Sequence, residues 1–185
     1  MTLKEYIRNV SEFDKRYAET IETDLDTREL PLYAFTDNVF RGNLESIALG
    51  LGAANADIIN GLDISTIQLF VGPTGSGAPL HYHGPALNFM AKGTKRWQLF
   101  PPSEARFSIK PAAGWNREYS GYNRTQTTMF GCTQRTGDVL FIPGTWSHAT
   151  ENLVFSTGIA VEFKNPIMVR NNNSGFSSVL CVVHL

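Results

Sequence analysis

Three of the four histidines in this chain stand in two short motifs whose residue types suit a metal site. His81 and His83 form a His-x-His pair, and His148 ends the segment 143–148, Pro-Gly-Thr-Trp-Ser-His. Side chains on a strand alternate between its two faces, so a His-x-His pair on a strand presents both imidazoles on one face. Three neutral imidazoles suit iron, zinc, copper or nickel better than magnesium or calcium. The sequence therefore predicts a metal centre with these three histidines as its ligands.

The segments that would position the histidines read as β-strands. Residues 64–71 alternate apolar and polar side chains and are rich in β-forming types. Turn clusters, such as the Gly-Pro-Thr-Gly-Ser-Gly stretch at 72–77, separate this segment from further strand candidates at 79–83, 87–91, 95–100, 127–133, 138–142 and 154–163. Many short strands divided by turns indicate an all-β antiparallel sandwich or barrel.

The segments that precede the predicted strands have helical or extended patterns. Residues 2–19 carry apolar side chains at helical spacing, residues 30–35 read as extended chain, and Asp37 is placed to cap a second short helix. A length of 185 residues predicts one domain. We expect an N-terminal helical and extended segment, 1–61, packed on a barrel, 62–164, and followed by a flexible tail, 165–185. Within the barrel, residues 101–126 read as a long loop of the kind that forms lids or binding surfaces.

Composition argues against several classes of protein. The net charge is −1 and no basic cluster occurs, so nucleic-acid binding through phosphates has little support. No apolar run approaches the length of a membrane span, and two cysteines, Cys132 and Cys181, do not make a disulfide framework. The first residues lack the apolar core of a signal peptide, but Asn-x-Ser/Thr sequons leave a secretory location open. The sequence fixes neither the oligomeric state nor the compartment, which could be cytoplasm, nucleus or the lumen of the endoplasmic reticulum.

Longer motifs resemble a known family. Gly75-(x5)-His81-x-His83 resembles the first cupin motif, and residues 137–152 resemble the second. The stretch 88–102, Asn-Phe-Met-Ala-Lys-Gly-Thr-Lys-Arg-Trp-Gln-Leu-Phe-Pro-Pro, resembles the JmjC-domain oxygenases, in particular their small hydroxylase-type members. The likeness covers roughly residues 62–163, and one branch of that family shares the His-x-His form. It implies a double-stranded β-helix (cupin or jelly-roll) fold, an Fe(II) centre at its open end and 2-oxoglutarate as co-substrate.

The resemblance also implies roles for single residues. By motif position, His81, His83 and His148 would be the metal-binding and catalytic residues. Lys95 would pair with the distal carboxylate of 2-oxoglutarate, and Asn88 would line the same pocket. These roles agree with simple chemistry, because a buried lysine needs a compensating anion and a dicarboxylate supplies one. Without that context, a solvated surface position is the ordinary alternative for Lys95.

The chain departs from the family pattern at four positions. His83 stands where the family usually has a carboxylate, which leaves one more positive charge at the metal and makes zinc an alternative to Fe(II). Ala78 and Ala160 stand where hydroxyl residues often help to bind 2-oxoglutarate. Glu162 stands where an asparagine is frequent, and it adds a negative charge that would oppose a dicarboxylate.

Three functional hypotheses follow, in this order. The first is a 2-oxoglutarate-dependent dioxygenase that hydroxylates a protein or peptide side chain. The second is a catalytically silent JmjC fold that binds metal and serves as an interaction module, which the changes at Ala78, Ala160 and Glu162 favour. The third is a three-histidine cupin dioxygenase that uses no 2-oxoglutarate and binds its substrate directly at the metal. The sequence does not identify a substrate.

Overall fold

The computed structural model describes residues 62–110 and 128–164, together with residues 5, 6, 8–10, 12, 33–36 and 59. The expected second helix after Asp37 and the tail 165–185 lie outside these residues. Residues 5, 6, 8–10 and 12 are helical. The other residues of the helix expected over 2–19 are not among the described residues. In the described part of the chain, no helix has the length and apolar character needed to cross a membrane.

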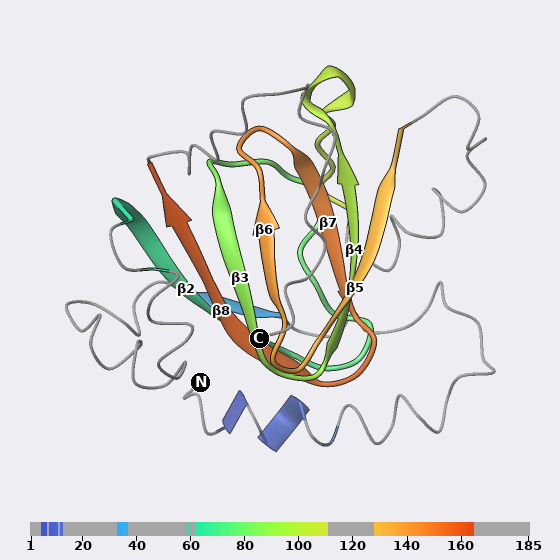
Figure 1. Cartoon of the computed structure of the whole chain (residues 1–185). Helices are drawn as coiled ribbons and strands as arrows, with labels where there is room; N and C mark the ends of the chain where they lie inside the picture. Colours follow the sequence, from blue (N-terminus) through green and yellow to red (C-terminus); the bar gives the residue numbers. More distant parts are fainter. Residues whose placement is uncertain are drawn as a thin grey trace.

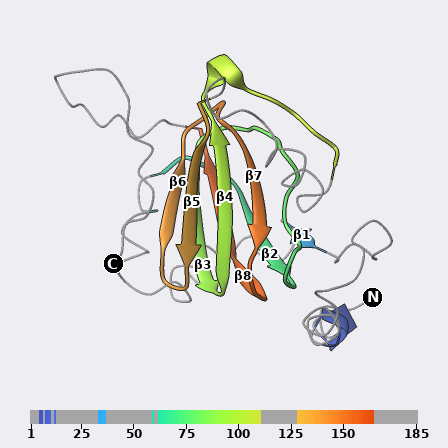
Figure 2. The ribbon, with the colours of Figure 1, turned by 90° about the vertical axis from the view of Figure 1, so that its right-hand side faces the viewer.

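Two antiparallel sheets face each other (Figure 1). The larger sheet has the strand order β1-β2-β8-β3-β6 and the smaller sheet the order β5-β4-β7. Figure 2 shows the smaller sheet in front of the larger one. The elements are β1 (Ala34–Thr36), β2 (Ile64–Gly72), β3 (Ala86–Lys92), β4 (Thr94–Phe100), the 3-10 turn η2 (Pro102–Glu104), β5 (Phe130–Arg135), β6 (Val139–Ile142), β7 (Ser147–Asn152) and β8 (Ser156–Phe163).

The path of the chain is that of a double-stranded β-helix. From β3 onward it crosses repeatedly from one sheet to the other, so that β8 returns to lie between β2 and β3. An isolated bridge between His81 and His148 adds the segment before β3 to the free edge of β7, which gives the smaller sheet a fourth position. This arrangement confirms the predicted all-β jelly-roll fold.

Each face of the larger sheet contributes to an apolar cluster. One face carries a cluster to which β3 and β8 contribute alternate residues, and Ile59 packs on it from before the barrel; its buried members are Ile59, Ile67, Leu87, Phe89, Val139, Ile159, Val161 and Phe163. The other face points between the sheets, where Ala86, Trp97, Leu99, Leu140 and Ile142 form a second cluster. Because side chains alternate along a strand, the residues between the members of the first cluster face the barrel interior.

Gly158 provides a test of how closely the larger sheet is packed. A Cβ at this position would meet the carbonyl oxygen of Phe89 and the ring of Phe70. We expect Gly158→Ala to lower the free energy of unfolding by about 2 kcal/mol, because an added methyl group has no space there. Gly131 is the matched control, since its Cβ would meet nothing nearer than the Trp97 oxygen at 3.8 Å. Urea unfolding of both variants measures the difference, and equal losses would contradict the packing described.

Candidate metal centre

The structure brings the three predicted histidines together at one end of the barrel. The ring centroids of His81 and His148 lie 4.4 Å apart, those of His83 and His148 4.7 Å, and those of His81 and His83 5.4 Å. Their potential ligand atoms all lie within 4.8 Å of one another. Among the described residues, no cysteine or carboxylate joins this group. The donor set is therefore three imidazoles from two distant parts of the sequence.

Hydrogen bonds orient each imidazole toward the common centre. Nδ1 of His81 lies 2.7 Å from the Pro79 oxygen, and Nδ1 of His83 lies 2.7 Å from the Gly84 oxygen. Nδ1 of His148 lies 3.1 Å from the Trp146 oxygen. A carbonyl oxygen can only accept, so Nδ1 carries the proton in all three rings and Nε2 keeps its lone pair. Such outer contacts fix the tautomer that a metal ligand needs.

The segment 79–83 is not the regular strand predicted from sequence. Only His81 forms a ladder pair, donating its N–H to the His148 oxygen at 3.1 Å and accepting from the His148 N–H at 2.7 Å. Pro79 and Pro85 have no N–H to donate, which interrupts a ladder on either side of this pair. The two histidines still converge, because the Nδ1 contacts orient each ring separately.

A strained turn ties the two histidine motifs together. Thr145 has φ of 66°, in the left-handed region that residues other than glycine rarely adopt. Its N–H donates to the His83 oxygen at 2.9 Å, which fixes the turn 143–146 against the first motif. A Cβ at Gly144 would come within 3.1 Å of the Pro85 ring, so this close approach favours glycine. Backbone strain of this kind is typical of functional sites.

Burial favours the neutral form of two of the three histidines, His81 and His148. It lowers the pKa of His148 well below the usual value, and the neighbouring His81 and His83 lower that pKa further. Burial also lowers the pKa of His81. Neutral imidazoles are the form that binds a metal ion.

This neutrality predicts that the metal-free protein loses stability in acid. Unfolded His148 takes up a proton near pH 6.5, whereas the folded residue resists it to a lower pH. The unfolded state therefore binds more protons over that interval, and the free energy of unfolding falls as pH drops below about 6.5, by up to about 1.4 kcal/mol per pH unit for one group. Urea unfolding in chelator at pH 7.5 and 5.5 measures the loss. His148→Gln should reduce it, and an unchanged loss in that variant would contradict the assignment.

Lys95 lies inside the barrel and not on its surface, with 1% of its area exposed. Its Nζ donates to the Tyr33 hydroxyl at 3.2 Å and lies 3.3 Å from the centroid of the Phe70 ring. No carboxylate of the described residues lies within ion-pair distance. Burial lowers the pKa of the Lys95 amine well below its ordinary value. Among the described residues, a cation in this position is stabilised by the Tyr33 hydroxyl and by aromatic faces, with no carboxylate to neutralise it.

Lys95 and the histidines share the barrel interior. His148 pairs with Leu99 of β4, and Asn152 of the same β7 strand pairs with Lys95. The two functional side chains thus start four residues apart along the ladder, about 13 Å at the rise of a strand. An extended lysine side chain and a five-carbon dicarboxylic acid together cover such a span.

A tyrosine hydroxyl contacts Lys95, and a threonine hydroxyl lies beside that tyrosine. Tyr33, which precedes β1, hydrogen-bonds to the Thr150 side chain as well as to Lys95. Burial is the main cause that raises the pKa of Tyr33, so its hydroxyl remains neutral. Thr150 also accepts a hydrogen bond from the Ala78 N–H at 3.0 Å. A threonine hydroxyl thus lies beside Ala78.

Asn88, Ala160 and Glu162 take neighbouring places on the inner face of the larger sheet. Asn88 is paired with Ala160, and its Oδ1 is buried without a hydrogen-bond partner in the described part of the chain. Glu162 is half-buried and is paired with Ala86 and Thr66. Alternation along β8 turns Glu162 inward, because its neighbours Val161 and Phe163 belong to the outer cluster.

Sequence reasoning missed Tyr33, Phe70 and Thr150 as parts of this site. Tyr33 lay in a segment read only as extended chain, and Phe70 read as an ordinary core residue. The strand that carries Thr150, β7, was not predicted at all. Its inward residues His148, Thr150 and Asn152 are polar and buried, so the apolar alternation that marks a strand is absent.

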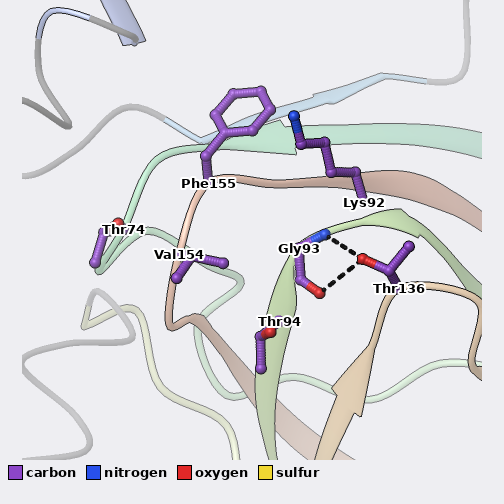
Figure 3. A pocket seen from close by; sticks show the side chains of 7 residues that line it. All are labelled: Thr74, Lys92, Gly93, Thr94, Thr136, Val154 and Phe155. Atoms are coloured by element: carbon purple, nitrogen blue, oxygen red, sulfur yellow. Dashed lines mark hydrogen bonds between the residues drawn. The ribbon is translucent and has the colours of Figure 1, made fainter.

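An open hollow of about 540 Å³ lies at the opposite end of the barrel (Figure 3). It is bordered by the turns after β3, β5 and β7 and includes Lys92, Gly93 and Thr136. The Gly93 N–H already donates to the Thr136 hydroxyl, as Figure 3 shows, and the Thr94 N–H donates to Ser156. These backbone donors are occupied, so the hollow lacks the convergent groups of the histidine end.

No family profile matches the chain. Individual proteins do: "JmjC domain-containing protein 8" of Homo sapiens is 38% identical over 88 residues, which cover 46% of this chain and 33% of that protein. "2-oxoglutarate and iron-dependent oxygenase JMJD4" of Homo sapiens is 24% identical over 136 residues, covering 66% of this chain and 33% of that protein. The chain thus spans about a third of the length of these relatives. Among solved structures, the Escherichia coli ribosomal oxygenase YcfD in complex with cobalt and succinic acid matches 80% of this chain and 36% of its own, with 14% identity and a TM-score of 0.48.

Proposed function

We propose that this chain, which belongs to the JmjC group of the cupin superfamily, is a metal-dependent oxygenase that uses 2-oxoglutarate to hydroxylate a protein or peptide side chain. One observation carries the proposal: the three-histidine centre and the buried Lys95 amine face the same barrel interior. A metal site does not require a buried lysine beside it, so the presence of both features in one interior favours a ligand that contacts both.

The residues present fit a metal ion. Three Nε2 lone pairs converge, and the Nδ1 atoms lie within hydrogen-bond distance of carbonyl oxygens. His81, His83 and His148 would hold the ion and leave positions for further ligands. Fe(II) is the ion we favour, and the absence of a carboxylate ligand keeps Zn(II) as the competing choice.

The residues also fit a dicarboxylate co-substrate. Lys95 would bind the distal carboxylate, with the Tyr33 hydroxyl beside it. The side-chain oxygen of Asn88, Oδ1, is buried and accepts no hydrogen bond from the described residues. Fe(II) with 2-oxoglutarate supplies an oxidation in which dioxygen places one atom in the substrate C–H bond and the other in succinate, with loss of carbon dioxide. The protein's own part is to bind the acid, orient it and exclude water with the apolar cluster around Trp97.

An anaerobic titration of Fe(II)-loaded protein with 2-oxoglutarate tests the proposal. We expect a visible metal-to-ligand charge-transfer band that saturates as the acid binds. Protein loaded with zinc is the matched control, because a filled d shell gives no such band. Succinate should then form on exposure to oxygen.

Absence of the band with iron still bound would overturn the proposal. It would favour one of the two alternatives named from the sequence. Oxygen uptake that does not depend on 2-oxoglutarate would identify a three-histidine dioxygenase. No oxygen uptake at all would identify a silent metal-binding interaction module.

A further inference from the structure

Tyr6 forms an unusual bridge far from the metal centre. Its hydroxyl donates to the Val71 oxygen at 2.7 Å and accepts from the Ala34 N–H at 3.2 Å. The side chain is 5% exposed, and together with Val10 it packs against Val71. A single phenol thus joins the N-terminal helical residues to β2 and to the start of β1.

β1 is a short strand at the edge of the larger sheet as the described residues define it. The strand has three residues and pairs with β2 through Ala34, Phe35 and Thr36. A two-strand edge contact of this length is weak by itself. The bond from Ala34 to Tyr6 therefore adds to the three ladder pairs that hold this strand in place.

The residue next to that bond is the one that reaches Lys95. Tyr33 stacks on Phe35, with ring centroids 6.1 Å apart, and its hydroxyl accepts from Lys95 Nζ at 3.2 Å. The Phe70 ring beneath the Lys95 amine belongs to the residue that pairs with Phe35. Tyr6 and Lys95 are thus linked through Ala34 and Tyr33 in successive contacts.

We propose that Tyr6 is a positioning residue for the anion site, and that the docked N-terminal residues complete that site by holding Tyr33 against Lys95. The inference rests on the proposed function for the identity of the anion, 2-oxoglutarate. Loss of the Tyr6 hydroxyl releases the Ala34 N–H, and β1 then moves with Tyr33. By reciprocity, an anion bound at Lys95 stabilises β1 and the docking of Tyr6.

The first experiment measures the dissociation constant of 2-oxoglutarate with Fe(II)-loaded protein under anaerobic conditions. Tyr6→Phe should raise it about fivefold, the loss expected for one hydrogen bond, and should leave the affinity for the metal unchanged. Tyr82→Phe is the matched control, because it removes the same hydroxyl group from a tyrosine that is 57% exposed. An unchanged dissociation constant in Tyr6→Phe would overturn the proposal.

A double variant shows whether the effect passes through Tyr33. Tyr33→Phe should weaken 2-oxoglutarate binding to a similar degree, and Tyr6→Phe combined with Tyr33→Phe should lose little more than either alone. Losses that multiply would show that Tyr6 acts by another route, and the positioning role would be wrong.

Hydrogen exchange separates this inference from the proposed function, since it needs neither metal nor acid. In the metal-free protein, Tyr6→Phe and Lys95→Met should each speed the exchange of the β1 amides, while Lys92→Met should not. If the wild-type protein binds no 2-oxoglutarate, the proposed function fails. The exchange result then decides by itself whether Tyr6 and Lys95 are coupled through β1. Unchanged exchange in Lys95→Met would contradict that coupling.

Discussion

Lys95→Met is expected to abolish 2-oxoglutarate binding and at the same time to stabilise the metal-free protein. The lysine amine is buried against Phe70 and lacks a carboxylate partner in the described structure, so its burial costs free energy until an anion binds. Methionine fills a similar volume without that cost, and we expect the free energy of unfolding to rise by about 1–3 kcal/mol. Removal of the only described cation beside the proposed acid site should weaken 2-oxoglutarate binding at least about a hundredfold.

The two effects are measured independently, by urea unfolding and by the anaerobic charge-transfer titration. Lys92→Met is the matched control, because Lys92 lies exposed at the end of β3 and should change neither quantity. A Lys95→Met protein that binds 2-oxoglutarate as well as the wild type would remove Lys95 from the site. A lower free energy of unfolding in Lys95→Met would mean that the contacts of the buried amine stabilise the metal-free fold.

His83→Ala is expected to cause the second large effect, the loss of tight metal binding. His83 is half-buried, so the fold should survive the change, but one of three convergent Nε2 atoms is removed. We expect the metal dissociation constant to rise at least about a hundredfold, and oxygenase activity to be lost with it. Isothermal titration with Fe(II) or Zn(II) gives the constant directly.

Two further variants make this result specific. Tyr82→Ala changes the residue between His81 and His83, which is exposed, and should leave the metal affinity unchanged. His83→Asp restores a ligand of the type that the related oxygenases usually have, and should bind metal more tightly than the alanine variant. If His83→Ala binds metal like the wild type, the centre has two protein ligands and the three-histidine assignment is wrong.

Much of the fold followed from local pattern. The strands β2, β3, β4, β5, β6 and β8 were predicted within a few residues, because β-forming and apolar residues recur there between turn signals. β7 could not be found in this way. Its inward side chains belong to the site and to a buried polar network, including Asn152, which donates to Gly72 and Ser76. Where function requires polar groups inside a barrel, the periodic signal disappears.

The candidate site divides in the same manner. His81, His83 and His148 were selected by residue type and spacing, and Lys95 and Asn88 by likeness to the JmjC motif. The same likeness indicated that two hydroxyl residues expected to bind 2-oxoglutarate are replaced by Ala78 and Ala160. The structure places the Tyr33 hydroxyl beside Lys95 and the Thr150 hydroxyl beside Tyr33.

The sequence by itself thus predicted the three candidate metal ligands, the all-β class and the lysine that the structure buries. Tertiary structure alone decided that Lys95 is 1% exposed, that Phe70 covers its amine and that Tyr33 reaches it across 62 positions of sequence. The physical reason is that spacing and periodicity are properties of neighbouring residues, whereas contacts between strands depend on their register. The register that pairs Ala34 with Val71 and Lys95 with Asn152 is set by the packing of the whole barrel.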